Sequence, residues 1–240
     1  MSRPTDILRQ LESEMAAMAD PARAALLAGF FKTGPGEYGH GDVFLGITVP
    51  RQRAVAKKYP GLSLARIRKL LKSRFHEHRL TALIVLTGQY AKAETAEKER
   101  IFEFYLANTG RINNWDLVDL SAPNIVGEFL RDKPRRRGVL AKLARSGDLW
   151  ERRIAMLATL AFIRAGEFAP TLAIARRLLG DGHDLIHKAV GWMLREVGKR
   201  DQAVEEAFLA EHVPAMPRTM LRYAIEKFPP QKRAHYMGLR

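Results

Sequence analysis

The chain has 240 residues, of which 47% are hydrophobic, and this is enough for one large domain or two small ones with a packed core. The net charge is +14 at pH 7, and basic residues occur from Arg3 to Arg240. This composition excludes a disordered tail and predicts a folded basic surface that suits a polyanion, either nucleic acid or an anionic membrane face. Solubility alone is the simpler alternative.

The absence of cysteine excludes disulfides, thiolate metal sites and iron–sulfur clusters, and it favours a reducing, cytoplasmic location. The first fifteen residues interleave charged and apolar side chains, so no secretory signal peptide is expected. The longest run with little charge, residues 154–163, is about half of the ~20 residues that a membrane span needs. We predict that this run is a buried core helix.

From the N-terminus onward, apolar residues recur at three- and four-residue spacing, whereas strand-like alternation is nearly absent. The first helix is marked by Leu8, Leu11 and Met15. Turn residues interrupt the pattern at Asp20-Pro21, residues 33–42, Pro60-Gly61, Thr109-Gly110, residues 180–182 and Pro229-Pro230. The sequence therefore predicts more than ten helices with short connections.

One position recurs along the chain at a nearly constant interval. Arg79, Arg153 and Lys188 each precede an apolar run, Asp116 lies 37 residues after Arg79 and 37 before Arg153, and Arg222 continues the series. This spacing is close to the HEAT-type repeat of about 40 residues. We predict an all-α, HEAT-like repeat α-solenoid, a curved right-handed superhelix of antiparallel helix pairs, as a single domain over residues 1–240. Chance alignment of amphipathic helices is the alternative.

Residues 33–42 (TGPGEYGHGD) form the one glycine-rich loop. They lack the Lys-Ser/Thr of a phosphate-binding loop and the glycine spacing of a dinucleotide site, so they predict no nucleotide. A flexible surface connection is the favoured interpretation, although Tyr38 and His40 are placed where they could touch a ligand.

Trp115 and Asp119 lie four residues apart in the stretch NNWDLVD. Four residues turn a helix through about 400°, so the two side chains share one face. Aspartate is a poor interior helix residue and Pro123 follows closely, which predicts a short helix that ends near the pair. In the alternative interpretation Trp115 belongs to the core and Asp119 caps a helix that starts at Ser121 or Ala122.

Two further residues stand out later in the chain. Trp192 follows Gly191, which leaves room for a backbone or a ligand, although a core tryptophan is the simpler interpretation. Arg153 is an isolated charge between Trp150 and an apolar run, so it is expected to reach the rim, to pair with an acid on the next repeat, or to hold a phosphate. If the repeats place these positions on adjacent helices, two indoles, one carboxylate and one guanidinium converge.

These motifs resemble the AlkD-like DNA alkylation repair glycosylases, a family built from HEAT-like repeats. The resemblance covers residues 20 to 228 and rests on FLGITVP (44–50), NNWDLVD (113–119), LWERRIAML (149–157) and KAVGWMLREVGK (188–199). It implies that Asp119, Trp115 and Trp192 are catalytic residues, and that Arg153 and the two tryptophans bind DNA. It also implies that the concave face holds the duplex without an enclosing base pocket. The loop at 33–42 has no certain counterpart in the family.

The implied function is excision of cationic alkylated purines, N7-alkylguanine and N3-alkyladenine, from duplex DNA, by a cytoplasmic monomer that needs no cofactor or metal and has no membrane partner. The chemistry agrees, because a cationic purine leaves without being protonated. A carboxylate that stabilises the oxocarbenium-like sugar and orients a water is then sufficient. A non-catalytic binder of damaged or branched DNA is the alternative, and a protein scaffold is a weaker one.

Overall fold

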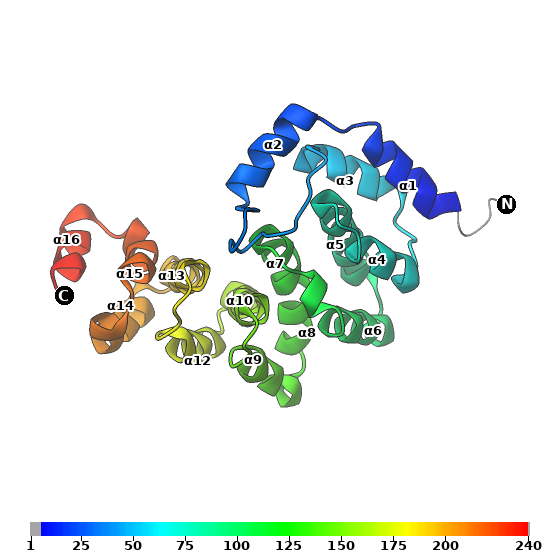
Figure 1. Cartoon of the computed structure of the whole chain (residues 1–240). Helices are drawn as coiled ribbons and strands as arrows, with labels where there is room; N and C mark the ends of the chain where they lie inside the picture. Colours follow the sequence, from blue (N-terminus) through cyan, green and yellow to red (C-terminus); the bar gives the residue numbers. More distant parts are fainter. Residues whose placement is uncertain (1–5, 240) are drawn as a thin grey trace. The chain divides into compact units, whose positions relative to one another are not determined.

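The computed structural model of the chain describes residues 6–239, which are helical along most of their length (Figure 1). Within these residues the only β-type pairing is an isolated parallel bridge between Val43 and Phe75. The chain divides into two compact units, one ending at Ser121 and the other beginning at Ala122. None of the helices in residues 6–239 is long and apolar enough to cross a membrane.

The first unit contains α1 (Asp6–Ala16), α2 (Pro21–Phe30), α3 (Val49–Lys58), α4 (Leu64–Leu71), α5 (His76–Lys92), α6 (Thr95–Leu106), a 3-10 turn (Thr109–Arg111) and α7 (Trp115–Ala122), whose last residue opens the second unit. α2 begins at the predicted Asp20-Pro21 break, because the Asp20 carboxylate accepts the Arg23 N–H (3.0 Å) and proline fits the first helical position. The helices α3, α4 and α6 pack on α5, whose stretch 80–86 is apolar except for Thr81 and is mostly buried.

The second unit contains a π-helical turn (Pro123–Gly127), α8 (Glu128–Arg131), α9 (Gly138–Leu143), α10 (Leu149–Ala158), α11 (Leu160–Arg164), α12 (Ala169–Leu178), α13 (Asp184–Gly198), α14 (Gln202–His212), α15 (Arg218–Ala224), α16 (Pro230–Gly238) and 3-10 turns at Pro134–Arg136, Val213–Ala215 and Ile225–Lys227. Its helices form two rows, with α10, α13 and α15 in one and α9, α12 and α14 in the other (Figure 1). α13 packs on α10, α12, α14 and α15 and is the central helix of this unit.

The all-α fold and the number of helices above ten are confirmed for residues 6–239. All five recurrent positions lie within the first two turns of a helix, on α5, α7, α10, α13 and α15. In the second unit the three marked helices also share one row (Figure 1). The period therefore identifies the repeating helix pair, while a single domain over residues 1–240 stays a prediction.

The expected core helix at residues 154–163 is buried but is not continuous. α10 ends at Ala158 and α11 begins at Leu160. At the step between them, the Thr159 N–H bonds to the Met156 carbonyl (3.1 Å) and the Thr159 hydroxyl donates to the same carbonyl (2.6 Å). This tighter, three-residue closure interrupts the α-helical pattern, since a threonine hydroxyl competes for backbone carbonyls.

Candidate functional site

The helix α7 carries the Trp115–Asp119 pair, and Asn114 fixes where this helix begins. The Asn114 side-chain oxygen accepts the Trp115 N–H (2.8 Å), and the Asn114 carbonyl accepts the Val118 N–H (3.1 Å). Trp115 and Asp119 are both half-buried and lie one turn apart on the same helix, as predicted. Asp119 stands inside α7, and no helix begins at Ser121. The alternative interpretation of Asp119 as a helix cap is therefore wrong.

The indole of Trp115 belongs to an aromatic cluster at the end of α2. It stacks on Phe31, with ring centroids 5.0 Å apart and an interplanar angle of 12°. Phe30 meets the same indole edge-on at 5.8 Å, and 64% of Phe30 is exposed. On its other side Phe31 stacks on the buried Phe44, at 5.0 Å. Trp115 is therefore supported from one side by buried rings and lies beside an exposed one.

Beneath this cluster lies a buried group of charged side chains centred on His76. The His76 Nδ1 is 3.1 Å from an Asp42 carboxylate oxygen, and its Nε2 is 2.8 Å from the Asp116 carboxylate. Asp42 also accepts hydrogen bonds from the Arg79 guanidinium (2.6 Å) and from the Asn114 amide (3.2 Å). Asp42, the last residue of the glycine-rich loop, is therefore hydrogen-bonded both to the start of α5 and to Asn114, which caps α7.

Burial alone would lower the pKa of His76, but the Asp116 carboxylate and the hydrogen bonds to Asp116 and Asp42 outweigh it and raise this pKa to about 9. Burial likewise opposes the ionised form of Asp42, yet His76 and Arg79 hold the pKa of that carboxyl below its usual value. At neutral pH the group is therefore an imidazolium and a guanidinium bracketed by two carboxylates. His76 also contacts Phe31 and Phe44, which connects the ionic group to the aromatic cluster.

Asp119 lies near the phenol of Tyr105. The Tyr105 and Ser121 hydroxyl oxygens are 2.9 Å apart, and the Ser121 hydroxyl donates to the Leu117 carbonyl (2.5 Å), so Tyr105 is the donor to Ser121. Burial raises the pKa of Tyr105, and the nearby Asp119 charge adds to this rise. Tyr105 therefore stays neutral, and the ionisable group on this face of α7 is the Asp119 carboxylate.

The other two predicted site residues lie in the second unit, on the packed helices α10 and α13. Trp192 is half-buried, and its Nε1–H donates to Glu196 (3.1 Å). The expected close approach beside it is confirmed, because a Cβ on Gly191 would lie 2.4 Å from the Met220 carbonyl oxygen of α15. Arg153 is only 5% exposed, and its guanidinium donates to the Leu185 carbonyl (2.6 Å). The structure thus joins Arg153 to the first turn of the helix that bears Trp192.

Trp115 and Asp119 are brought together as expected, whereas the convergence of all four residues stays a prediction. The sequence patterns did not single out Phe31, Asp42 or His76 as parts of this region. The signals were present: four ionisable residues open the helix α5 in the stretch HEHR, and a pair of phenylalanines lies one residue before the glycine-rich loop. Within residues 6–239 no group of three or more histidine, aspartate or glutamate side chains is arranged to hold a metal ion.

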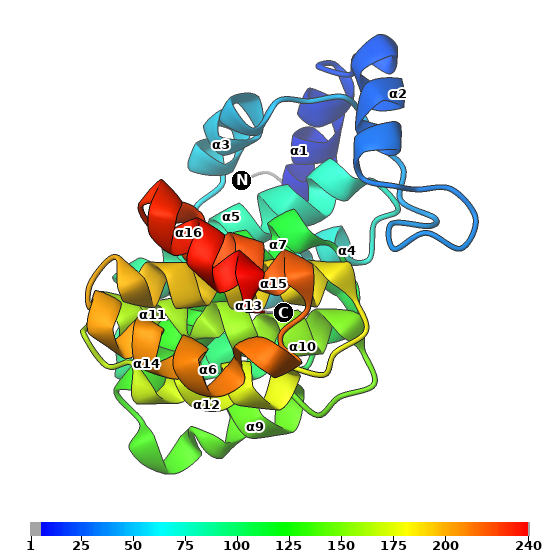
Figure 2. The ribbon, with the colours of Figure 1, turned by 90° about the vertical axis from the view of Figure 1, so that its left-hand side faces the viewer.

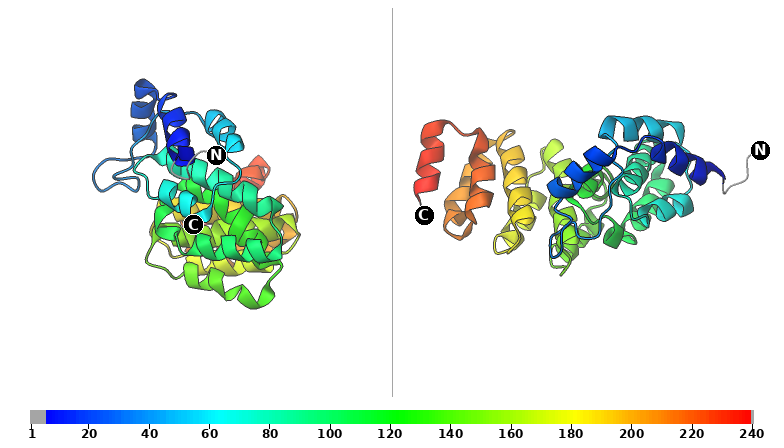
Figure 3. Two further views of the ribbon diagram at one scale, coloured as in Figure 1. Left: turned by 90° about the vertical axis from the view of Figure 1, so that its right-hand side faces the viewer. Right: turned by 45° about the horizontal axis from the view of Figure 1, so that its top comes forward.

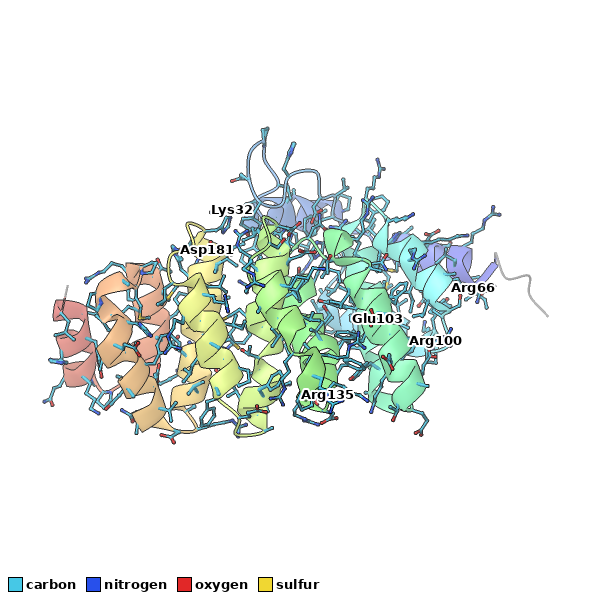
Figure 4. The ribbon with its side chains drawn as sticks, turned by 90° about the horizontal axis from the view of Figure 1, so that it is seen from below. Lys32, Arg66, Arg100, Glu103, Arg135 and Asp181 are labelled. Carbon is cyan, nitrogen blue, oxygen red and sulfur yellow. The ribbon has the colours of Figure 1, made fainter. Side chains whose placement is uncertain are left out.

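A separate hollow of about 470 Å³ lies between α4 and α6 in the first unit. It is lined by apolar residues such as Leu64 and Phe104 and by the charged residues Arg68, Glu99, Arg100 and Glu103. Arg100 and Glu103 are labelled in Figure 4. The lining mixes both signs of charge, and the Arg68 guanidinium already lies over the Phe104 ring at 5.2 Å. Because it shares no residue with the Trp115 region and offers no net positive field, it is not the candidate site.

Comparisons with known proteins identify a family that matches this chain and solved structures that share its fold. The family described as "DNA alkylation repair enzyme" matches residues 11–228. The fold is similar to that of a "Predicted DNA alkylation repair enzyme from Enterococcus faecalis", with a TM-score of 0.70, 18% identity, and coverage of 89% of this chain and 98% of that one. It is also similar to AlkD2 from Streptococcus mutans, with a TM-score of 0.57, 16% identity, and coverage of 77% and 91%. No curated protein sequence matches the chain. Since the family match spans most of its length, the chain belongs to the DNA alkylation repair enzyme family.

Proposed function

We propose that this protein is a DNA glycosylase that hydrolyses the N-glycosidic bond of cationic alkylated purines, N7-alkylguanine and N3-alkyladenine, in duplex DNA. Membership of the family supports a role in DNA repair. The observation that carries the finer proposal is the Trp115–Asp119 pair on one turn of α7, where a carboxylate and an indole lie together at the surface without being fully buried.

In the proposed reaction the bond between C1′ and the purine nitrogen breaks, and its electron pair stays with the purine. Because the alkylated purine begins as a cation, it leaves as a neutral base and needs no general acid. The Asp119 carboxylate stabilises the positive charge that develops on the sugar and orients the water that adds to C1′. The proton of that water passes to the carboxylate and then to solvent.

The aromatic rings are proposed to hold the damaged nucleotide. An indole face attracts a cationic base or an electron-poor sugar edge with about 0.5–2 kcal/mol. Trp115 is suited to this role because Phe31 supports its ring by stacking at 5.0 Å, which fixes its orientation before a ligand arrives. Trp192, whose indole N–H is occupied by Glu196, is proposed to present its ring in the same manner.

Arg153 is proposed to take part in DNA binding in one of two ways. With its guanidinium on the Leu185 carbonyl, it holds the first turn of α13 and so positions the helix that carries Trp192. A direct contact with a phosphate requires the guanidinium to leave that carbonyl, because the side chain is 5% exposed. The net charge of +14 supports duplex DNA as the partner. We further propose a metal-independent monomer in the cytoplasm.

The test is to incubate the purified protein with duplex DNA that contains N7-methylguanine and to quantify the free base by chromatography, with and without EDTA. The proposal expects release of free base at the same rate in both samples. Tight binding to the damaged duplex without any release would instead favour the alternative, a non-catalytic binder of damaged DNA. Loss of release in EDTA would contradict the metal-independent reaction.

A further inference from the structure

We infer that residues 32–41, which lie in the connection between α2 and α3, form a preformed arm that binds the phosphate backbone of duplex DNA beside Trp115, with Lys32 as the phosphate contact. The inference deepens the proposed function and rests on it only in taking DNA as the ligand. The arm projects beyond the helices of the first unit in two views (Figure 2 and Figure 3).

The arm is closed by its own hydrogen bonds, so it is an ordered Ω-type loop instead of a flexible connection. Its ends meet where the Lys32 carbonyl accepts the Gly39 N–H (3.0 Å). Across the tip, the Glu37 carboxylate accepts the Gly34 N–H (2.8 Å), and the Glu37 N–H bonds back to the Gly34 carbonyl (3.1 Å). Glycine is required at position 39, since a Cβ there would lie 2.3 Å from the Phe31 carbonyl oxygen.

Both ends of the arm are anchored to the elements that hold Trp115. At its start, Phe31 is stacked on the indole. At its end, the Asp42 carboxylate accepts hydrogen bonds from His76, Arg79 and Asn114. Replacing a whole buried ionic group with apolar residues often changes stability little, whereas removing one partner is destabilising, so we take the role of this group to be fixing one arrangement. Here the arrangement that it fixes is the direction in which the arm leaves the protein next to α7.

Lys32 has an unfavourable backbone conformation at the base of the arm. Its φ of 51° makes it the only non-glycine residue with positive φ among residues 6–239. It follows Phe31, the cap at the end of α2, and the Thr33 N–H returns to the Ala28 carbonyl (3.2 Å). Glycine is the usual residue at such a position, and a side chain there costs about 1 kcal/mol. Strain of this kind next to a candidate site indicates that the side chain itself has a function.

The charges and the shape of the arm suit a DNA strand. Lys32 is exposed and has no acidic partner in residues 6–239, and Figure 4 shows it where the loop leaves α2. The one acidic side chain of the arm, Glu37, accepts the Gly34 N–H. The tip is thin, because positions 34 and 36 are glycines. Each DNA strand carries a phosphate every ~3.4 Å along the helix axis, so a duplex that reaches Trp115 also brings phosphates to the neighbouring Lys32.

The test measures binding to an undamaged duplex by fluorescence anisotropy at several salt concentrations. Lys32→Asn removes the charge and keeps a residue that tolerates positive φ, so its melting temperature is expected to equal or exceed that of the wild type. A second variant lacks residues 34–38, which shortens the arm at the point where its ends already meet. Lys92→Gln is the matched control, because Lys92 is exposed at the opposite end of α5 from His76.

The expected result for Lys32→Asn is a salt dependence of log affinity that is shallower by about 0.9, the value of one phosphate contact. Between about 50 and about 200 mM salt, the wild type then loses roughly 3.5-fold more affinity than this variant. The shortened arm is expected to bind more weakly than the wild type, and Lys92→Gln is expected to match it. If Lys32→Asn and the shortened arm both match the wild type, the inference is overturned. If the two arm variants bind more weakly as expected but the wild type releases no base, the proposed glycosylase function is refuted and the inference about the arm stands.

Discussion

Replacing His76 with glutamine tests the buried ionic group through the pH dependence of stability. In the folded protein the pKa of His76 is raised from 6.5 to about 9 by the Asp116 and Asp42 carboxylates. A raised histidine pKa means that the stabilisation is complete below about pH 6.5 and is lost as the pH rises through 9. Asp42 behaves in the opposite sense, since its lowered pKa contributes stability that is lost only in acid, below about pH 3.8.

The magnitude follows from the size of the shift. One unit of pKa corresponds to about 1.36 kcal/mol, so a rise from 6.5 to about 9 corresponds to about 3 kcal/mol of unfolding free energy. Because His76 is 2% exposed, solvent screening reduces this value little. Glutamine keeps a donor that can reach a carboxylate, but it carries no charge at any pH. The variant therefore isolates the contribution of the imidazolium.

Urea unfolding of the wild type and of His76→Gln, measured from about pH 6 to about pH 10, gives the difference between their unfolding free energies at each pH. We expect this difference to be about 3 kcal/mol near pH 6 and to shrink toward zero near pH 10. His40→Gln is the matched control, because His40 is an exposed histidine on the arm. Parallel profiles for the wild type and His76→Gln would refute the charged state assigned to His76.

Three further predictions, two of them with a matched control variant, concern the buried Glu205, the helix contact at Gly191 and the indole of Trp115. Burial raises the pKa of Glu205 to about 8, and the Glu206 charge adds to it, so Glu205→Gln should stabilise the protein by up to about 3 kcal/mol at pH 7 and by little at pH 4.5, in urea unfolding. Gly191→Ala should destabilise by about 1–3 kcal/mol, because its Cβ meets α15, whereas Gly88→Ala, with nothing within 4 Å, should stabilise by about 0.5–1 kcal/mol. Trp115→Ala should reduce base excision with little change in melting temperature, whereas the buried Trp150→Ala should cost about 3–5 kcal/mol of stability. If the melting temperatures of Trp115→Ala and Trp150→Ala fall by a similar amount, Trp115 is a core residue.

The helices were predictable because their limits depend on neighbouring residues. The break at Asp20-Pro21 and the pairing of Trp115 with Asp119 need only local geometry, and both are confirmed. The interruption of the helix at Thr159 was not predicted, because an apolar sequence does not show where a threonine hydroxyl will donate a hydrogen bond to a backbone carbonyl.

The ionic group around His76 could not be predicted from spacing. His76 lies 34 residues from Asp42 and 40 from Asp116, and only the packing of α5 against the end of the loop brings the three together. The same applies to Arg153. Its sequence context is equally compatible with a phosphate contact and with the Leu185 carbonyl that it binds in the folded unit. Polar contacts between residues this far apart in the sequence can be assigned only once the fold is known.

Single-turnover excision of N7-methylguanine by Asp119→Asn tests the central proposal most directly. Asparagine keeps the shape of the side chain and most of its hydrogen bonds but removes the charge opposite the developing sugar cation. We expect the rate to fall by on the order of 10²-fold or more, about 3 kcal/mol of transition-state stabilisation, while affinity for the duplex holds or rises because a carboxylate near phosphates is removed. An unchanged melting temperature confirms that the variant is folded. Excision at the wild-type rate by Asp119→Asn would contradict the catalytic role of this carboxylate.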